Sequence, residues 1–129
     1  MSPRPSIKNI GQIAIPCHDV ARATAFYRDV VGLPFLFAAP NLAFFRCGEV
    51  RLMLTPVEQP ELAPPGSVVY FRTADLDGAT AALAAGGAKV ESAPHLITRM
   101  PDHELWMSFW RDTEGNLMAF MEERVGETK

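Results

Sequence analysis

Two side chains able to carry out acid–base chemistry, His103 and Glu104, are neighbours in this sequence. They precede a strongly apolar stretch, residues 105–110. A histidine titrates near neutral pH, so beside an apolar cavity it could transfer a proton. Successive side chains of a strand point to opposite faces, so we expect at most one of the two to face such a cavity. Both are candidate catalytic residues; the alternative for His103 is a solvated turn that begins at Pro101.

Three other polar side chains could bind a ligand. Gln12 falls on the strand face opposite Ile13, where its amide could line a cleft or instead bond to the backbone. Arg51 could meet an anionic group, the alternative being a solvated cation at the end of a strand. His95 lies in a stretch that we expect to be a long loop, residues 92–104, which could be a lid or plain surface.

The elements that must position these residues form a pattern that occurs twice. In the first half, apolar alternation and turn residues predict a helix from Asp19 to Gly32 and strands at 11–16, 35–38, 42–46 and 50–55. In the second half, they predict a helix capped by Asp75 or Asp77 and strands at 68–73, 88–92, 104–110 and 117–122. Residues 112–116 are the expected turn of the last hairpin, with Gly115 free to take a positive φ.

The two halves superimpose in sequence. An offset of 56 residues places Gln12 on Val68, and an internal repeat of this kind fixes which segments are equivalent. We therefore predict that the whole chain of 129 residues is one α+β domain. It would consist of two βαβββ modules at about 8–57 and 65–124, joined by a proline-rich linker at 56–66.

The composition argues against several classes of function. The net charge is -3 and the basic residues are scattered, whereas a nucleic-acid site needs clustered Lys and Arg. No apolar run reaches the ~18 residues of a membrane-spanning helix. Cys17 and Cys47 have no metal-site spacing, so we expect them to be reduced and buried. We expect a cytoplasmic protein that binds neither nucleic acid nor membrane.

Two segments at the ends of this repeat resemble a known family. IAIPCHDVARATAFYRDVVGLPF is similar to the opening of domains of the glyoxalase / bleomycin resistance protein / extradiol dioxygenase superfamily, also called the vicinal oxygen chelate group. FWRDTEGNLMAFMEE resembles their closing hairpin, with Thr113 where the family usually has proline. The resemblance covers roughly Lys8 to Glu123. It implies two βαβββ modules that curl into an open, cleft-forming barrel, with binding and catalysis inside the cleft.

The family's chemistry is centred on a divalent metal, which the matching positions of this sequence do not favour. Family ligands are His, Gln or Glu on the first strand of each module and Glu on the last. The matching positions are Gln12, Met53, Val68 and Ala119. Gln12 could offer a carbonyl oxygen, Met53 is a poor partner for a hard ion, and the other two cannot coordinate a metal. We therefore predict no metal and no other cofactor.

Two functional hypotheses remain. In the first, the cleft binds a small, mostly apolar molecule bearing a carbonyl or a carboxylate, without the family metal. Its lining residues would be Gln12, Arg51, Met53, Val68, Tyr70, Phe109 and Ala119. In the second, the chain is a lyase or isomerase of the glyoxalase type with His103 or Glu104 as acid or base, with or without a metal held by non-standard ligands.

The resemblance also implies a partner. The family often pairs modules across subunits, so we predict a homodimer. Trp106 and Trp110 alternate on an expected strand and are available for its interface.

Overall fold

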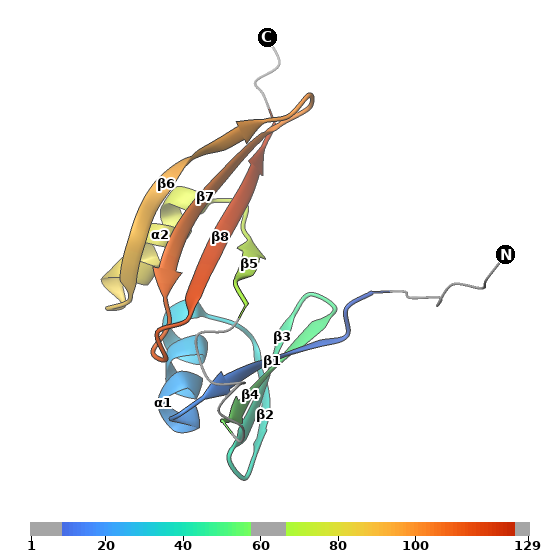
Figure 1. The fold of residues 1–129 in the computed structure, drawn as a ribbon, viewed down its shortest axis with the longest axis vertical. Coiled ribbons are helices and arrows are strands. Elements are labelled where there is room, and N and C mark those ends of the chain that lie inside the picture. Colours follow the sequence, from blue (N-terminus) through green and yellow to red (C-terminus); the bar gives the residue numbers. More distant parts are fainter. Residues whose placement is uncertain (1–8, 58–66, 126–129) are drawn as a thin grey trace, which may run out of the picture.

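The computed structural model describes residues 9–57 and 67–125. The first module comprises β1 (Gln12–Cys17), α1 (Val20–Ala25), the π-helix η1 (Phe26–Val31), β2 (Phe35–Ala39), β3 (Leu42–Cys47) and β4 (Val50–Pro56). The second comprises β5 (Val69–Arg72), α2 (Leu76–Ala85), β6 (Lys89–Arg99), β7 (Glu104–Arg111) and β8 (Leu117–Arg124). Figure 1 shows each module as a curved sheet with a helix beside it. None of the described helices is long and apolar enough to cross a membrane.

The two sheets have the same topology. Their strand orders are β1-β4-β3-β2 and β5-β8-β7-β6. In each module the first and last strands pair in parallel and the other neighbours pair antiparallel. The predicted α+β fold of two βαβββ modules in an open arrangement is therefore confirmed. The predicted linker lies almost entirely outside the described residues, so the limits of the modules stay a prediction.

Both helices begin at an aspartate, as the sequence predicts. The carboxylate of Asp19 accepts a hydrogen bond from the backbone N–H of Arg22 at 3.0 Å. Asp75 accepts one from the N–H of Gly78, also at 3.0 Å, so Asp75 and not Asp77 is the N-cap of α2. A capping carboxylate satisfies a backbone N–H that has no partner within the helix, which is why these positions fix where the helices start.

The first helix is wider at its end than an α-helix. The N–H of Gly32 donates to the carbonyl of Tyr27, five residues back, at 3.1 Å, whereas an α-helix bonds four residues back. Phe26 and Tyr27, which are neighbours in sequence, are both buried in this segment. Gly32 ends it at a φ of 83°, as expected for the predicted helix stop. The sequence pattern did not distinguish this π-helix from an α-helix.

The sixth strand is longer than predicted. The strand expected at 88–92 and the loop expected at 92–104 are corrected to β6, which pairs with β7 along Lys89–Arg99. The register shifts at three places along this pair, and such bulges interrupt the alternation that marks a strand. Pro94 is tolerated because β6 lies at the edge of its sheet. His95 therefore lies on a strand and not in a loop.

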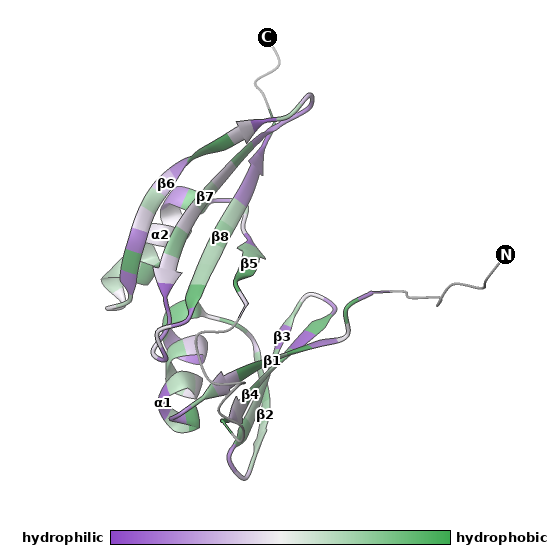
Figure 2. Ribbon diagram, in the orientation of Figure 1, coloured by the Kyte–Doolittle hydropathy of each residue, from purple (hydrophilic) through white to green (hydrophobic). Residues whose placement is uncertain are grey.

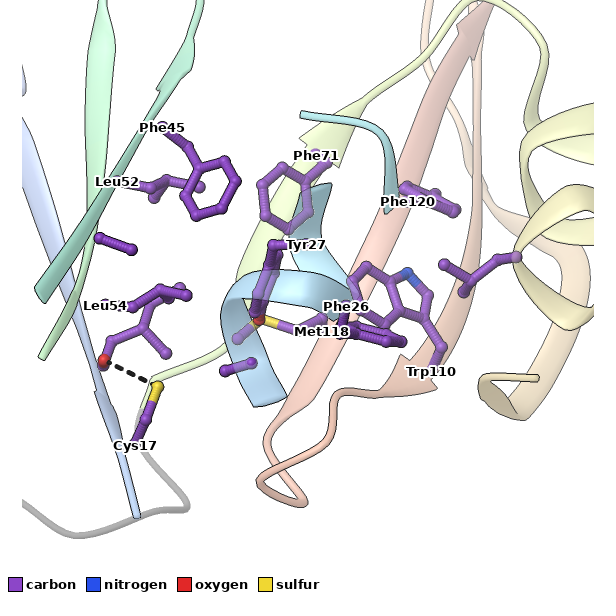
Figure 3. Close-up of a cluster of buried hydrophobic side chains, with 14 of the residues drawn as sticks. Cys17, Phe26, Tyr27, Phe45, Leu52, Leu54, Phe71, Trp110, Met118 and Phe120 are labelled. Carbon is purple, nitrogen blue, oxygen red and sulfur yellow. Dashed lines mark hydrogen bonds between the residues drawn. The ribbon is translucent and has the colours of Figure 1, made fainter. Parts of the chain in front are cut away.

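One hydrophobic core serves both modules (Figure 3). Tyr27 packs against Phe45 of β3 with ring centroids 6.2 Å apart, and its neighbour Phe26 packs against Trp110 of β7 at 6.0 Å. The helical segment α1–η1 therefore lies between the two sheets. Trp110 is fully buried in this core, which corrects the expectation that it is available for a subunit interface. Trp106 is half-buried against the same core.

Polar contacts also join the modules. The hydroxyl of Tyr27 donates to Oδ2 of Asp112 at 2.7 Å, and both side chains are buried. The carboxylate of Glu114 accepts from the backbone N–H groups of His18 and Asp19 at 2.6 and 3.1 Å, so the last hairpin of module two also caps the helix of module one. The hydrophobic core lies on one side of each sheet, so the other face of each sheet turns away from it.

Candidate functional site

The outer face of the first sheet carries two of the polar candidates, Gln12 and Arg51. Ile15, Phe45 and Leu52 are buried toward α1, and side chains alternate along strands, so their neighbours point outward. We call this surface the module-one face and define it by Gln12, Ala14, Phe37, Phe44, Arg46, Arg51 and Met53. Cross-strand pairing places Gln12, Arg51 and Arg46 in one row, with an apolar row of Ala14, Met53, Phe44 and Phe37 beside it.

Contacts within the module-one face connect a cation, an amide and two aromatic rings. Nε of Arg51 donates to Oε1 of Gln12 at 2.7 Å. Nε2 of Gln12 lies 3.8 Å from Sδ of Met53. The guanidinium of Arg51 is 5.3 Å from the ring centroid of Phe44, which stacks on Phe37 at 4.5 Å. The structure thus brings together three residues that the sequence singled out, and it surrounds them with apolar contact area.

The outer face of the second sheet is apolar around Ala119 and carries Arg72 beside Met121. We call it the module-two face and define it by Tyr70, His95, Met107, Phe109, Ala119 and Met121. Ala119 pairs with Tyr70 on one side and with Phe109 on the other, and it is fully buried. The rings of Tyr70 and Phe109 meet edge to face at 6.2 Å, and the ring of His95 lies 6.3 Å from that of Phe109. Val68, just before β5, is half-buried.

The two catalytic candidates lie at the far end of β7. Nδ1 of His103 is hydrogen-bonded to Oδ1 of Asp102 at 2.7 Å, which lowers the pKa of Asp102. Phe109 lies six positions after His103, so the two are about 20 Å apart along an extended strand.

Glu104 is engaged on the other side of that strand. Its carboxylate accepts hydrogen bonds from Nε1 of Trp106 at 3.0 Å and from Nε of Arg99 at 3.1 Å. Together these two contacts lower the pKa of Glu104, the Trp106 hydrogen bond having the larger effect. Among the contacts of the described residues, none joins His103 or Glu104 to the polar cluster around Arg51.

A shallow pocket of about 210 Å³ lies beside the Gly48–Glu49 turn, where β3 ends and β4 begins next to the start of β1. It is lined by Gly11, Leu36, Arg46, Glu49, Val50 and Arg51. Arg46 was not among the sequence candidates. The signal that could have found it is its equal distance with Arg51 from the Gly48–Glu49 turn, because residues opposite one another in a hairpin share a face.

The model of the family described as Glyoxalase/Bleomycin resistance protein/Dioxygenase superfamily matches residues 9–120. The chain belongs to this superfamily. Among curated proteins, none matches the chain.

Solved structures of other proteins share the fold. TnmS3, an antibiotic binding protein from Streptomyces sp. CB03234, is 23% identical with a TM-score of 0.74, over 93% of this chain and 99% of that one. A lactoylglutathione lyase from Agrobacterium tumefaciens is 27% identical with a TM-score of 0.69, over 92% and 95%. An integron cassette protein from the mobile metagenome of V. Cholerae is 17% identical with a TM-score of 0.78, over 92% and 98%. One fold thus carries different functions, so the chemistry must be argued from the site.

The superfamily metal does not fit the residues at the matching positions. The carbonyl oxygen of Gln12 already accepts a hydrogen bond from Arg51, whose positive charge would repel a divalent cation at that oxygen. Met53 beside it is a soft donor, and Val68 and Ala119 lie in the other module with no donor atom in the side chain. Among the described residues, no group of three or more His, Cys, Asp or Glu could hold a metal ion. That the protein carries no metal stays a prediction.

Proposed function

We propose that this superfamily member binds a small, mostly apolar molecule bearing a carbonyl or a carboxylate, and that it does so without the superfamily metal. The observation that carries the proposal is the Arg51–Gln12 pair beside an aromatic surface. Among the contacts of the described residues, Arg51 donates to Gln12 through Nε alone. Its two terminal guanidinium nitrogens are therefore left for a ligand oxygen. Phe44 and Met53 supply apolar contact, and a few polar groups on an apolar lining are typical of small-molecule sites.

A homodimer would close this site. The two outer faces lie in separate sheets, and Phe37 and Tyr70 on them are 49% and 48% exposed. A small-molecule pocket buries most of its ligand, which one open sheet does not do. The module-two face of a second copy, laid over the module-one face, would supply the missing wall. Superfamily members often pair modules across subunits, which supports this arrangement. Trp106 is half-buried, so it can contribute to the interface only through its exposed part.

The experiment combines a thermal-shift screen with light scattering at micromolar concentration. A library of small aromatic and aliphatic carbonyl compounds and carboxylates should raise the melting temperature of chelator-treated wild type, because a ligand bound only by the folded state stabilises it. The mass should be that of a dimer. If no compound stabilises the fold with or without divalent metal, the binding proposal fails. The cytoplasmic location also stays a prediction, which fractionation of the source cells would test.

A lyase or isomerase of the glyoxalase type is the second candidate function. The observation that favours it is the hydrogen bond between His103 and Asp102, since a carboxylate that orients a histidine is a common feature of acid–base sites. Glu104 is a weaker base, because its contacts with Trp106 and Arg99 lower its pKa. Replacing His103 with alanine should slow turnover of a carbonyl substrate by ~10²–10⁴-fold if it transfers a proton. A binding protein would show no turnover in either form.

A further inference from the structure

Two arginines are paired across β3 and β4, close to the turn at the end of that hairpin. Arg46 and Arg51 are directly paired residues of antiparallel strands, so their side chains share the module-one face. Both are exposed, and both line the pocket of about 210 Å³ described above.

Like charges directly opposite one another in a sheet destabilise it unless a counter-charge lies near them. In the part of the chain that the structure describes, the side chain of Arg46 has no ion-pair partner, and Arg51 donates only to the neutral amide of Gln12. Glu49 lines the same pocket but forms no ion pair with either arginine among these residues. The lining therefore has two positive groups and one negative group, and it retains an excess of positive charge.

An aromatic surface adjoins the two cations. Phe44 lies two residues before Arg46 on the same face of β3, with Met53 opposite it on β4 and Phe37 stacked beside it. Adjacent rows on one face of a sheet are about 7 Å apart. A flat ligand with its charge at one end could thus contact both rows at once.

From these contacts we infer that Arg46 and Arg51 form a subsite for the carboxylate of an aromatic acid whose ring lies on Phe44 and Met53. The guanidinium groups match the two oxygens of a carboxylate in shape and charge, and the bound anion supplies the counter-charge that the arginine pair lacks. The inference rests on the proposed function and narrows it from carbonyl or carboxylate to carboxylate. It also adds Arg46 to the binding residues.

The test compares 2-naphthoate with its neutral amide, 2-naphthamide, by titration calorimetry on the full chain. Wild type is expected to bind the acid more tightly than the amide. Added NaCl should lower the affinity for the acid and not that for the amide, because salt screens exposed charges. Arg46→Gln and Arg51→Gln should each weaken binding of the acid about tenfold, a modest loss because both arginines are exposed. Binding of the amide should weaken less, because its carbonyl oxygen carries no net charge for the guanidinium groups to pair with. Glu49→Gln should raise the affinity for the acid, because it removes the negative group from the pocket lining. The matched control is Arg22→Gln, an exposed arginine of α1 outside the pocket lining.

Four results would overturn the subsite. Equal affinities for acid and amide, or an unchanged affinity for the acid in Arg46→Gln, would remove it while the wider binding proposal stands. Failure of wild type to bind either compound would also remove it, and the broader thermal-shift screen then decides the proposed function separately. The fourth result is a melting temperature of unliganded Arg46→Gln below that of wild type. We expect the melting temperature of unliganded Arg46→Gln to equal or exceed that of wild type, because the substitution removes repulsion between the arginines.

Discussion

The two outer faces of this molecule share one topology and differ in chemistry. Gln12 on β1 lies beside Arg51 on β4, and the repeat places Val68 and Leu117 at the corresponding positions of the second module. The first pair joins an amide to a cation, and the second offers only aliphatic groups. The topology therefore fixes where side chains meet, while the residue types decide what the position can bind. Figure 2 shows that hydropathy also changes along single strands, since β8 is hydrophobic near its start and hydrophilic near its end.

Both sheets should unfold together because they share one core. Replacing Trp110 with alanine tests this, and it has the largest expected effect on the free energy of unfolding. Trp110 is fully buried and contacts Phe26 of the other module at 6.0 Å. We expect a loss of about 3–5 kcal/mol in the free energy of unfolding, measured with urea, in one transition for the whole chain. Trp106→Ala, at a half-buried position, is the control and should cost less. Two separate transitions would show that the modules fold independently and that they do not share one core.

A smaller effect is expected where the two helical segments touch. A Cβ on Gly86 would lie 2.7 Å from Cγ1 of Val30, so Gly86→Ala overpacks the junction between α2 and η1. We expect a loss of about 1–3 kcal/mol, measured by thermal unfolding. Val30→Ala in the same chain should recover part of that loss, because it removes the clashing methyl groups. A Gly86→Ala protein as stable as wild type would contradict the close approach.

The junction should also respond to alkaline pH. Burial, and then the charge and hydrogen bond of Asp112, raise the pKa of Tyr27 well above its ordinary value of 10.0. The neutral phenol is thus favoured in the folded state, so this stability is present below pH 10 and is lost as the pH rises above it. Tyr27→Phe should cost about 1 kcal/mol at pH 7 and flatten the dependence between pH 9 and 11, followed by circular dichroism. An unchanged pH profile in the variant would refute this role.

The helix caps should behave alike in the two modules, with the smallest effect of this series. Asp19→Ala and Asp75→Ala should each cost up to about 1 kcal/mol, because each removes an acceptor from a helix N-terminus. Asp77→Ala is the control, since Asp77 makes only a surface ion pair with Arg124 at 3.2 Å. Thermal unfolding of the three variants checks the order, and a larger loss for Asp77→Ala would reverse the assignment of the cap.

Much of the scaffold could be predicted because it depends on local spacing. Asp19 and Asp75 cap helices as expected, and Gly115 takes a φ of 81° in the last hairpin. The length of β6 could not be predicted, because its bulges hide the strand alternation and only pairing with β7 sustains it. The widening at η1 likewise depends on burying two neighbouring aromatic residues in a shared core.

The site was only partly predictable for the same reason. Gln12, Arg51 and Met53 do meet on one face, because strand parity is a local property. Tyr70 and Ala119, expected in the same cleft as these residues, lie on the other sheet of the chain, with the helical segment α1–η1 between the two sheets. That separation comes from tertiary packing, which no local pattern encodes. The roles of His103 and Glu104 stay predictions.

The central claim is that the module-one face binds an apolar carbonyl or carboxylate compound without a metal. The most direct measurement is an assigned amide NMR titration of chelator-treated protein with 2-naphthoate. We expect saturable shifts of the amide signals, concentrated at Gln12, Phe44, Arg46 and Arg51, without any added divalent ion. Shifts that appear only after a metal is added, or that leave these four residues unchanged, would contradict it.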